Sequence, residues 1–148
     1  MGIDKYIETR RSVREYKDKD IDYKIIGEII EKAKEAPSSG NIQNWKIIIV
    51  KEKEKREKIA RSCLNQLWML QAPVHLILCY DEENIKILYP KQYEEFSIQN
   101  TAILASFIML KATEAKVASC WVAIPNKEEI KKIVNIHDGS IIPSLILT

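Results

Sequence analysis

The sequence predicts a single domain in which α-helices alternate with β-strands. Apolar residues recur three and four positions apart over residues 22–35, the spacing of an amphipathic helix that Asp22 caps and Pro37 stops. Short runs of apolar, β-branched residues, most clearly at 45–50, indicate buried strands. The chain has 148 residues, the length of one domain, and we assign residues 1–148 to one unit.

The same patterns place the remaining elements. Helices are expected over residues 2–10, 22–35, 53–62, 92–115 and 126–134. Strands are expected over residues 45–50, 74–80, 117–124 and 141–147, with Pro143 interrupting the last. The middle of the helix over 92–115 is apolar on all sides, and in a chain this small its full burial requires a second subunit.

Composition excludes several classes of protein. Lys and Arg number 23 against 21 Asp and Glu, and this near balance gives no reason to expect a nucleic-acid partner. The longest uncharged run, Ile98 to Leu110, is too short to cross a membrane. The three cysteines are widely spaced without a CxxC pair, which argues against disulfides and a metal site and fits a cytoplasmic location.

The segment Arg10-Arg11-Ser12-Val13-Arg14 places three guanidiniums and a hydroxyl within a short stretch. In an extended chain Arg10, Ser12 and Arg14 share one face, and in a helix Arg10 and Arg14 do. In either case two forked, permanently charged donors can converge on one phosphate, with the hydroxyl of Ser12 beside them. The alternative is an exposed basic turn that binds nothing.

A second polar segment, Pro37 to Trp45, connects the helix expected over 22–35 to the next strand. It offers both donors and acceptors, as the pyrimidine edge and ribityl hydroxyls of a flavin require. These side chains belong to Ser38, Ser39, Asn41 and Gln43. Together with the arginines they suggest a phosphorylated cofactor, although neither a GxGxxG nor a GxxxxGKS/T phosphate motif is present. The alternative is a polar loop without a ligand.

A third segment, Ser119 to Ile124, lies on a predicted strand and contains small residues that let the backbone approach a ligand closely. Cys120 lies within it. A nucleophilic role for this thiol would need a neighbouring base, and the sequence identifies none. We therefore assign no catalytic protein residue.

In this order and at this spacing, RRSVR, APSSGNIQNW, Ala72-Pro73-Val74 and SCWV resemble the FMN-dependent nitroreductase family. The resemblance extends from Tyr6 to Leu147. It implies an α+β fold of three layers, α/β/α, with a central and mostly antiparallel sheet. It also implies a homodimer that holds two FMN molecules at the subunit interface.

The resemblance also implies roles for individual residues. Arg10, Arg11, Ser12 and Arg14 would hold the FMN phosphate and its surroundings. Pro37, Ser38, Ser39, Asn41 and Gln43, from the partner subunit, would line the flavin ring and the ribityl chain. Asn65 would face the pyrimidine edge. Trp121, Val122 and Ala123 would run along one face of the flavin.

The implied activity is that of an oxidoreductase. NAD(P)H as co-substrate would pass a hydride to the flavin N5, and a nitroaromatic, a quinone or a similar small-molecule electron acceptor would then be reduced in a ping-pong cycle. The alternatives are a flavin carrier or sensor with little turnover and a specialised reaction such as flavin fragmentation or dehalogenation. Trp68 stands where some relatives have Lys. We expect a C-terminal basic pair and arm to be missing and the region 81–95 to form a reduced lid.

Overall fold

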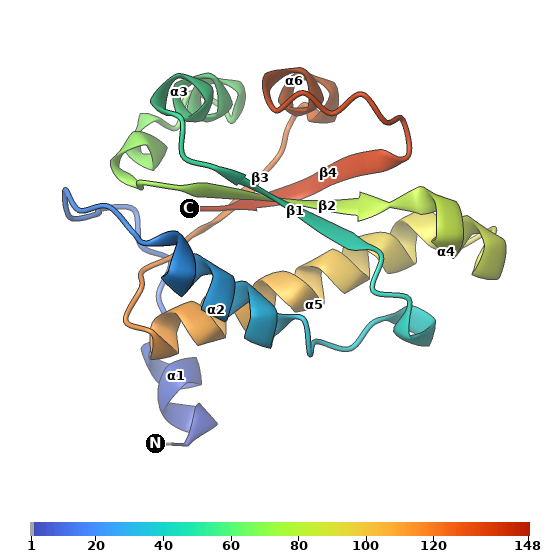
Figure 1. The fold of residues 1–148 in the computed structure, drawn as a ribbon, viewed down its shortest axis with the longest axis horizontal. Coiled ribbons are helices and arrows are strands. Elements are labelled where there is room, and N and C mark those ends of the chain that lie inside the picture. The colour runs from blue at the N-terminus through green and yellow to red at the C-terminus, as the bar shows by residue number, and fades with distance from the viewer. Residues whose placement is uncertain (1) are drawn as a thin grey trace.

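The computed structural model describes residues 2–148, and in it helices cover both faces of one sheet (Figure 1). Helices α3 (Lys53–Ser62) and α6 (Lys127–Ile133) lie on one face, whereas α2 (Tyr23–Ala33) and α5 (Tyr93–Glu114) lie on the other. This arrangement confirms the expected α+β fold in three layers. The layers are stabilised because the helices and the sheet bury their apolar faces against one another.

Four strands form the sheet in the order β1-β2-β4-β3, and every neighbouring pair is antiparallel. Their bounds are β1 Trp45–Val50, β2 His75–Asp81, β3 Trp121–Ala123 and β4 Ile141–Leu147. The two central strands, β2 and β4, are buried almost throughout, as expected for strands covered by helices on both faces. The expected antiparallel sheet is therefore confirmed.

One extra residue interrupts the pairing of the two central strands. Leu78 faces Leu145 and Cys79 faces Pro143, so Ser144 is left over on β4 as a bulge. Proline has no N–H group to donate, which suits it to such a position. The strand therefore continues through Pro143, and the hydroxyl of Ser144 lies 2.9 Å from Oγ1 of Thr101 in α5.

Two clusters of buried apolar residues form the core, one on each side of the sheet. The first joins α2 and α5 to the sheet and includes Ile29, Leu104 and Ile108. The second joins α3 and α6 to the other face and includes Ile59 and Ile130. Because the first cluster already buries most of α5, only part of that apolar helix is left for a partner, including Ile98 and Phe107, which are 44% and 39% exposed.

Two elements differ from the expectation, and two 3₁₀ turns complete the set of elements. Helix α4 (Glu82–Leu88) was not predicted; the carboxylate of Asp81 caps it by accepting from the N–H of Glu83. Strand β3 begins at Trp121, later than expected, because the chain first leaves α5 and Ser119 contacts the N-terminal segment, while Cys120 exchanges backbone hydrogen bonds with Thr148, just beyond β4. Residues 39–41 and 67–71 form single 3₁₀ turns, η1 and η2. The short helix α1 (Ile3–Thr9), like α4, packs against α5.

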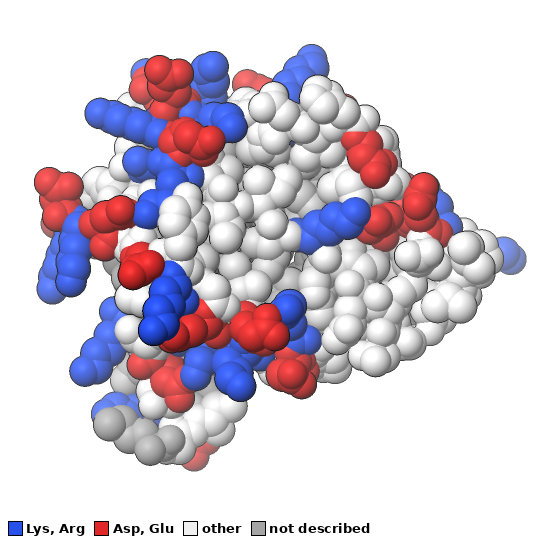
Figure 2. Space-filling model, viewed as in Figure 1, with Lys and Arg blue, Asp and Glu red and all other residues white. Residues whose placement is uncertain are grey.

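Charged side chains of both signs are interleaved on the face drawn in Figure 2, and this face carries no broad field of one sign. None of the helices within residues 2–148 combines the length and the apolar character that a bilayer crossing demands.

Candidate functional site

The N-terminal arginine segment lies beside the segment that leads into β3. Helix α1 ends at Arg10, whose N–H donates to the carbonyl of Tyr6 over 3.0 Å. Ser12 then forms a parallel β-bridge with Ser119, and the N–H of Val13 donates to the carbonyl of Ser119 over 3.1 Å. The segment is thus extended, the first of the two conformations considered above, in which alternate residues share a face.

The positive charges of Arg10 and Arg14 both affect the thiol of Cys120. Burial raises the pKa of the Cys120 thiol, and the positive charges of Arg14 and Arg10 oppose this increase without cancelling it. Both positive charges therefore influence the thiol of Cys120, the residue that precedes β3. The thiol itself remains protonated near neutral pH, which agrees with assigning it no nucleophilic role.

The third guanidinium is engaged differently. Nη1 of Arg11 donates to the carbonyl of Glu8 over 2.6 Å and to that of Arg10 over 2.9 Å. These bonds satisfy carbonyls at the C-terminal end of α1, where a cation is also favoured by the helix dipole. Arg11 thus caps the helix that ends at Arg10.

The turn after α3 leads to a residue that contacts the arginine segment. Leu64 and Asn65 adopt left-handed backbone angles, with φ of 58° and 57°, and both are exposed. They direct the chain into η2 (Leu67–Gln71), where the ring of Trp68 lies under Arg14, 5.7 Å from Cζ to the ring centroid. Asn65 is therefore close in sequence to a residue that contacts the arginine segment.

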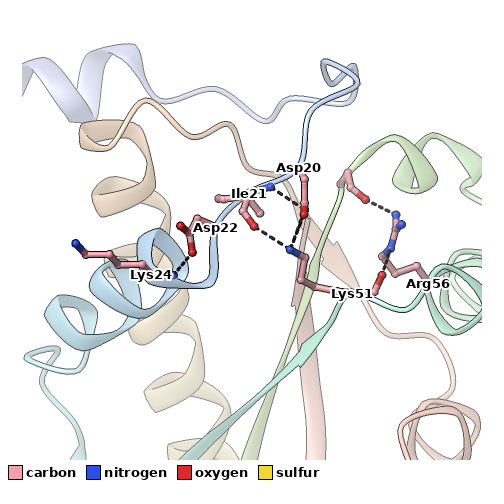
Figure 3. Close-up of polar contacts among 7 residues, drawn as sticks. Asp20, Ile21, Asp22, Lys24, Lys51 and Arg56 are labelled. Atoms are coloured by element: carbon pink, nitrogen blue, oxygen red, sulfur yellow. Dashed lines mark hydrogen bonds and ion pairs between the residues drawn. The ribbon is translucent and has the colours of Figure 1, made fainter.

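A half-buried arginine holds the end of η2. Arg56 of α3 donates to the carbonyls of Leu70 and Ala72 at its end, over 3.1 and 2.5 Å. Figure 3 shows this guanidinium next to Lys51, whose ammonium binds Asp20 in the loop before α2. These contacts fix the position of η2 relative to the N-terminal loop, so that Trp68 meets Arg14 at a defined place.

Two residues of β3 have solvent-exposed side chains. Trp121 is 37% exposed and Ala123 is also exposed, whereas Val122 between them is buried in the core. This alternation is the ordinary consequence of strand geometry. Of the three residues predicted along the flavin, Val122 can therefore offer a ligand its backbone but not its side chain.

The segment Pro37 to Gln43, which we call the lip, lies elsewhere. It follows the C-terminal end of α2, whereas the arginine segment precedes the N-terminal end of that helix (Figure 1). An 11-residue helix is about 16 Å long. One chain therefore does not bring the lip to the arginines, and a site that uses both would need two chains.

The backbone of the lip is unusual. Gly40, Asn41 and Gln43 have φ values of 56°, 54° and 49°, in the left-handed region that non-glycine residues rarely adopt. Two contacts hold this shape: the N–H of Gln43 donates to Oγ of Ser38 over 2.9 Å, and the N–H of Asn41 donates to the carbonyl of Ser38 over 2.9 Å. The side chains of the lip are left exposed or half-buried.

Comparison with known proteins identifies the family. A sequence model described as the nitroreductase family matches residues 7–68 and 61–148, which together span nearly the whole chain. The chain belongs to the nitroreductase family. The resemblance noted in the sequence is thereby confirmed.

Relatives agree with this assignment. The chain is 34% identical over 114 residues to the FMN reductase (NAD(P)H) of Bacillus subtilis, an alignment that covers 77% of this chain and 45% of that protein. It is 31% identical over 104 residues to the NADH dehydrogenase of Thermus thermophilus, covering 66% and 51%. The chain thus spans about half the length of these two curated relatives. A solved nitroreductase family protein from Clostridium novyi has 25% identity and a TM-score of 0.88, covering 99% of this chain and 83% of that one.

Two features of this nitroreductase-family chain escaped the sequence analysis. Tyr16 closes the arginine segment: its hydroxyl lies 2.7 Å from Oγ1 of Thr148 and donates to the carbonyl of Val13 over 2.8 Å, and burial raises its pKa to about 12. Behind the lip, Asn44 and Asn100 form a buried amide pair. The signal for the second was present at Asn100, an amide within the mostly apolar helix α5.

Proposed function

We propose that this chain binds FMN and acts as an NAD(P)H-dependent flavin oxidoreductase. The observation that carries the proposal is the extended arginine segment, which the Ser12–Ser119 bridge holds beside the start of β3 so that Arg10 and Arg14 lie on one face. Within residues 2–148 no carboxylate pairs with either guanidinium, so their charge remains available for an external anion. A phosphate ester matches these forked donors, with the hydroxyl of Ser12 between them.

The proposal assigns a task to each predicted site residue. Arg10, Ser12 and Arg14 bind the phosphate, and Arg11 supports them by capping α1. Trp121 and Ala123 of β3 provide an open surface for one face of a flat ring. Asn65 offers an amide to the ring edge from the turn after α3. When bound, FMN supplies hydride transfer from NAD(P)H to an acceptor, while the chain supplies binding and orientation.

We further propose that the lip belongs to the site of a second copy of the chain. Pro37, Ser38, Ser39, Asn41 and Gln43 would then contact the flavin bound by the partner, because within one chain they lie at the far end of α2. Support comes from the exposed apolar side chains of α1 and α5, with Ile3 63%, Ile7 56% and Phe107 39% exposed. Such neighbouring apolar residues are typical of an interaction surface.

The acceptor that fits this proposal is a flat conjugated molecule, such as a nitroaromatic or a quinone. Such a molecule would stack where the nicotinamide had been, and its reduction requires no acid or base from the protein. The proposal needs no reactive thiol beside β3, and this agrees with the raised pKa of Cys120, which keeps its thiol protonated.

The test begins with the visible spectrum of the purified protein. We expect flavin absorption and release of FMN on denaturation, followed by steady-state oxidation of NADH or NADPH when menadione or a nitrofuran is added. A protein that stays colourless and does not bind added FMN would refute the proposal. Bound FMN without turnover would instead favour a carrier or sensor.

A further inference from the structure

A chain of buried amides and hydroxyls connects the lip to the middle of α5. Oδ1 of Asn100 accepts from the N–H and from Oγ of Ser39, over 2.9 and 3.2 Å. Nδ2 of Asn100 donates to Oδ1 of Asn44 over 2.9 Å. Asn44 in turn donates to Oγ of Ser97 over 2.9 Å and to the carbonyl of Asp81 over 3.0 Å.

The amide pair lies in the interior, whereas the lip lies at the surface. Asn100 is 1% exposed, Asn44 is 7% exposed and Ser97 is fully buried. Buried polar groups weaken a core unless each finds a partner, and a fully satisfied network rigidifies whatever it holds. Here it holds Ser39, the first residue of the 3₁₀ turn that contains Gly40 and Asn41, two of the three left-handed residues of the lip.

Strained backbone persists only where the surroundings fix it, and it is found mainly at functional sites. The lip has three left-handed residues, two of which are not glycine. Without the bonds from Asn100, nothing on the α5 side would hold Ser39 at the position from which this turn starts. The network therefore sets the direction in which the lip presents its groups.

We propose that Asn100 is a positioning residue for flavin binding, which it serves through Ser39, and that Asn44 fixes the orientation of the Asn100 amide. This inference rests on the proposed function, in which the lip contacts FMN. At position 100 an amide meets the requirement at any pH, because one end accepts from Ser39 while the other donates to Asn44. An ionised Asp keeps the acceptor and loses the donor, and Ala loses both.

The test measures the dissociation constant for FMN from the quenching of its fluorescence. Asn100→Ala removes the acceptor of Ser39 and the donor to Oδ1 of Asn44, and we expect about a tenfold weaker affinity, the effect of one unsatisfied buried group. Thr101→Val is the matched control. Thr101 is adjacent, equally buried and bonded to Ser144, away from the lip. It should lower the melting temperature similarly and leave the affinity unchanged.

Asn100→Asp adds a readout that a purely structural role would not give. At low pH the protonated carboxyl can donate to Oδ1 of Asn44 and accept from Ser39, as the native amide does. At higher pH the carboxylate faces Oδ1 of Asn44 without a proton between them. The ratio of the variant's dissociation constant to that of the native protein should therefore be near one at low pH and rise with pH. If Asn100→Ala does not fold, the pH dependence of Asn100→Asp tests the proposal by itself.

The outcomes separate the two proposals. If the native protein does not bind FMN, the proposed function fails and this inference fails with it. If the native protein binds FMN while Asn100→Ala and Thr101→Val bind it equally well, or if the Asn100→Asp ratio does not change with pH, the flavin assignment stands and the positioning role of Asn100 is wrong.

Discussion

The guanidinium of Arg14 lies over the indole of Trp68, with 5.7 Å between Cζ and the ring centroid. This contact joins the N-terminal segment to η2, which Arg56 holds in place through the carbonyls of Leu70 and Ala72. A cation over an aromatic face is attracted by the ring quadrupole and loses part of its freedom before any ligand arrives. Arg14 is therefore partly oriented in advance, which lowers the entropy lost on binding an anion.

The first prediction concerns this arginine pair. Arg10→Ala combined with Arg14→Ala should abolish retention of FMN through purification, because each lost bond to a charged phosphate costs about 1.5–3 kcal/mol. The two losses together correspond to an affinity decrease of about 100-fold or more. The helical content by circular dichroism should stay unchanged, since neither side chain lies in the core.

Arg61→Ala is the control for this double variant. Arg61 is an exposed arginine of α3 that pairs with Glu57 over 2.7 Å, so its removal changes the net charge without touching the proposed site. It should retain FMN. A double variant that is still yellow after dialysis would show that the phosphate binds elsewhere.

The second prediction concerns the apolar surface of α1 and α5. Phe107 borders a shallow hollow of about 350 Å³ that Ile3, Tyr6 and Leu110 also line. Phe107→Glu should weaken self-association, because it removes a large apolar side chain from the contact and puts there a carboxylate that loses water on association, a cost that the lysines bordering the hollow, Lys32 and Lys111, offset only in part. Sedimentation velocity over a dilution series should show a shift towards the monomer.

A charge change on another layer serves as the control for Phe107. Lys58→Glu alters an exposed residue of α3, on the opposite side of the sheet, and should leave the association constant unchanged. Equal sedimentation of Phe107→Glu and the native protein would exclude this surface as the dimer contact.

The sequence predicted the elements whose pattern is local and left out those that depend on tertiary contacts. The apolar periodicity of α2 and the β-branched run of β1 gave both elements nearly their observed bounds. The capping carboxylate of Asp81 and the single buried residue of α4, Ile85, were too weak a pattern to predict that helix. Strand β3 started late because Lys116, at φ 59°, ends α5 and the next residues leave it.

The candidate site also combines residues that a local sequence pattern reveals with contacts that only the fold creates. The arginine segment and the lip were recognisable because their residue types are unusual at that spacing. The contact of Ser12 with Ser119, and the bonds from Asn100 to Ser39, join residues far apart in the chain. No local pattern selects such partners. An amide inside an apolar helix, as at Asn100, signals only that some polar partner must exist.

The third prediction concerns the pH dependence of folding. His75 is fully buried at the start of β2; its Nε2 lies 3.0 Å from the carbonyl of Met69, and its Nδ1 has no partner within residues 2–148. Burial lowers its pKa to about 4, with the charge of Arg56 adding to the decrease. The unfolded chain takes up this proton near pH 6.5 and the folded chain does so only near pH 4, so stability falls as pH decreases through that window.

The lowered pKa of His75 corresponds to a loss of about 3 kcal/mol in the free energy of unfolding. This loss is complete below about pH 4 and absent above about pH 6.5. Urea unfolding at several pH values should show a smaller pH slope for His75→Gln than for the native protein. Identical slopes for His75→Gln and the native protein would mean that the imidazole takes up its proton at the same pH in the folded and the unfolded chain.

The fourth prediction compares two glycines, for which the same substitution should have opposite effects. Gly27 lies within α2 with nothing within 4 Å of an added Cβ, so Gly27→Ala should stabilise the protein by about 0.5–1 kcal/mol. Gly40 has φ of 56°, and an added Cβ would lie 2.7 Å from the hydroxyl of Tyr89. Gly40→Ala should destabilise the protein, because left-handed backbone alone costs a non-glycine residue about 1–2 kcal/mol.

The steric and backbone contributions at Gly40 can be separated with Tyr89→Phe. Without the hydroxyl, the nearest atom to the added Cβ is the ring carbon Cζ at 3.6 Å, an ordinary contact distance. In a double-mutant cycle, Tyr89→Phe should therefore restore part of the stability lost in Gly40→Ala, and the remaining loss should equal the backbone cost. Full recovery would show that the lip moves out of the left-handed conformation at no cost. If nothing is recovered, the hydroxyl does not constrain the lip, and the backbone angle accounts for the whole effect.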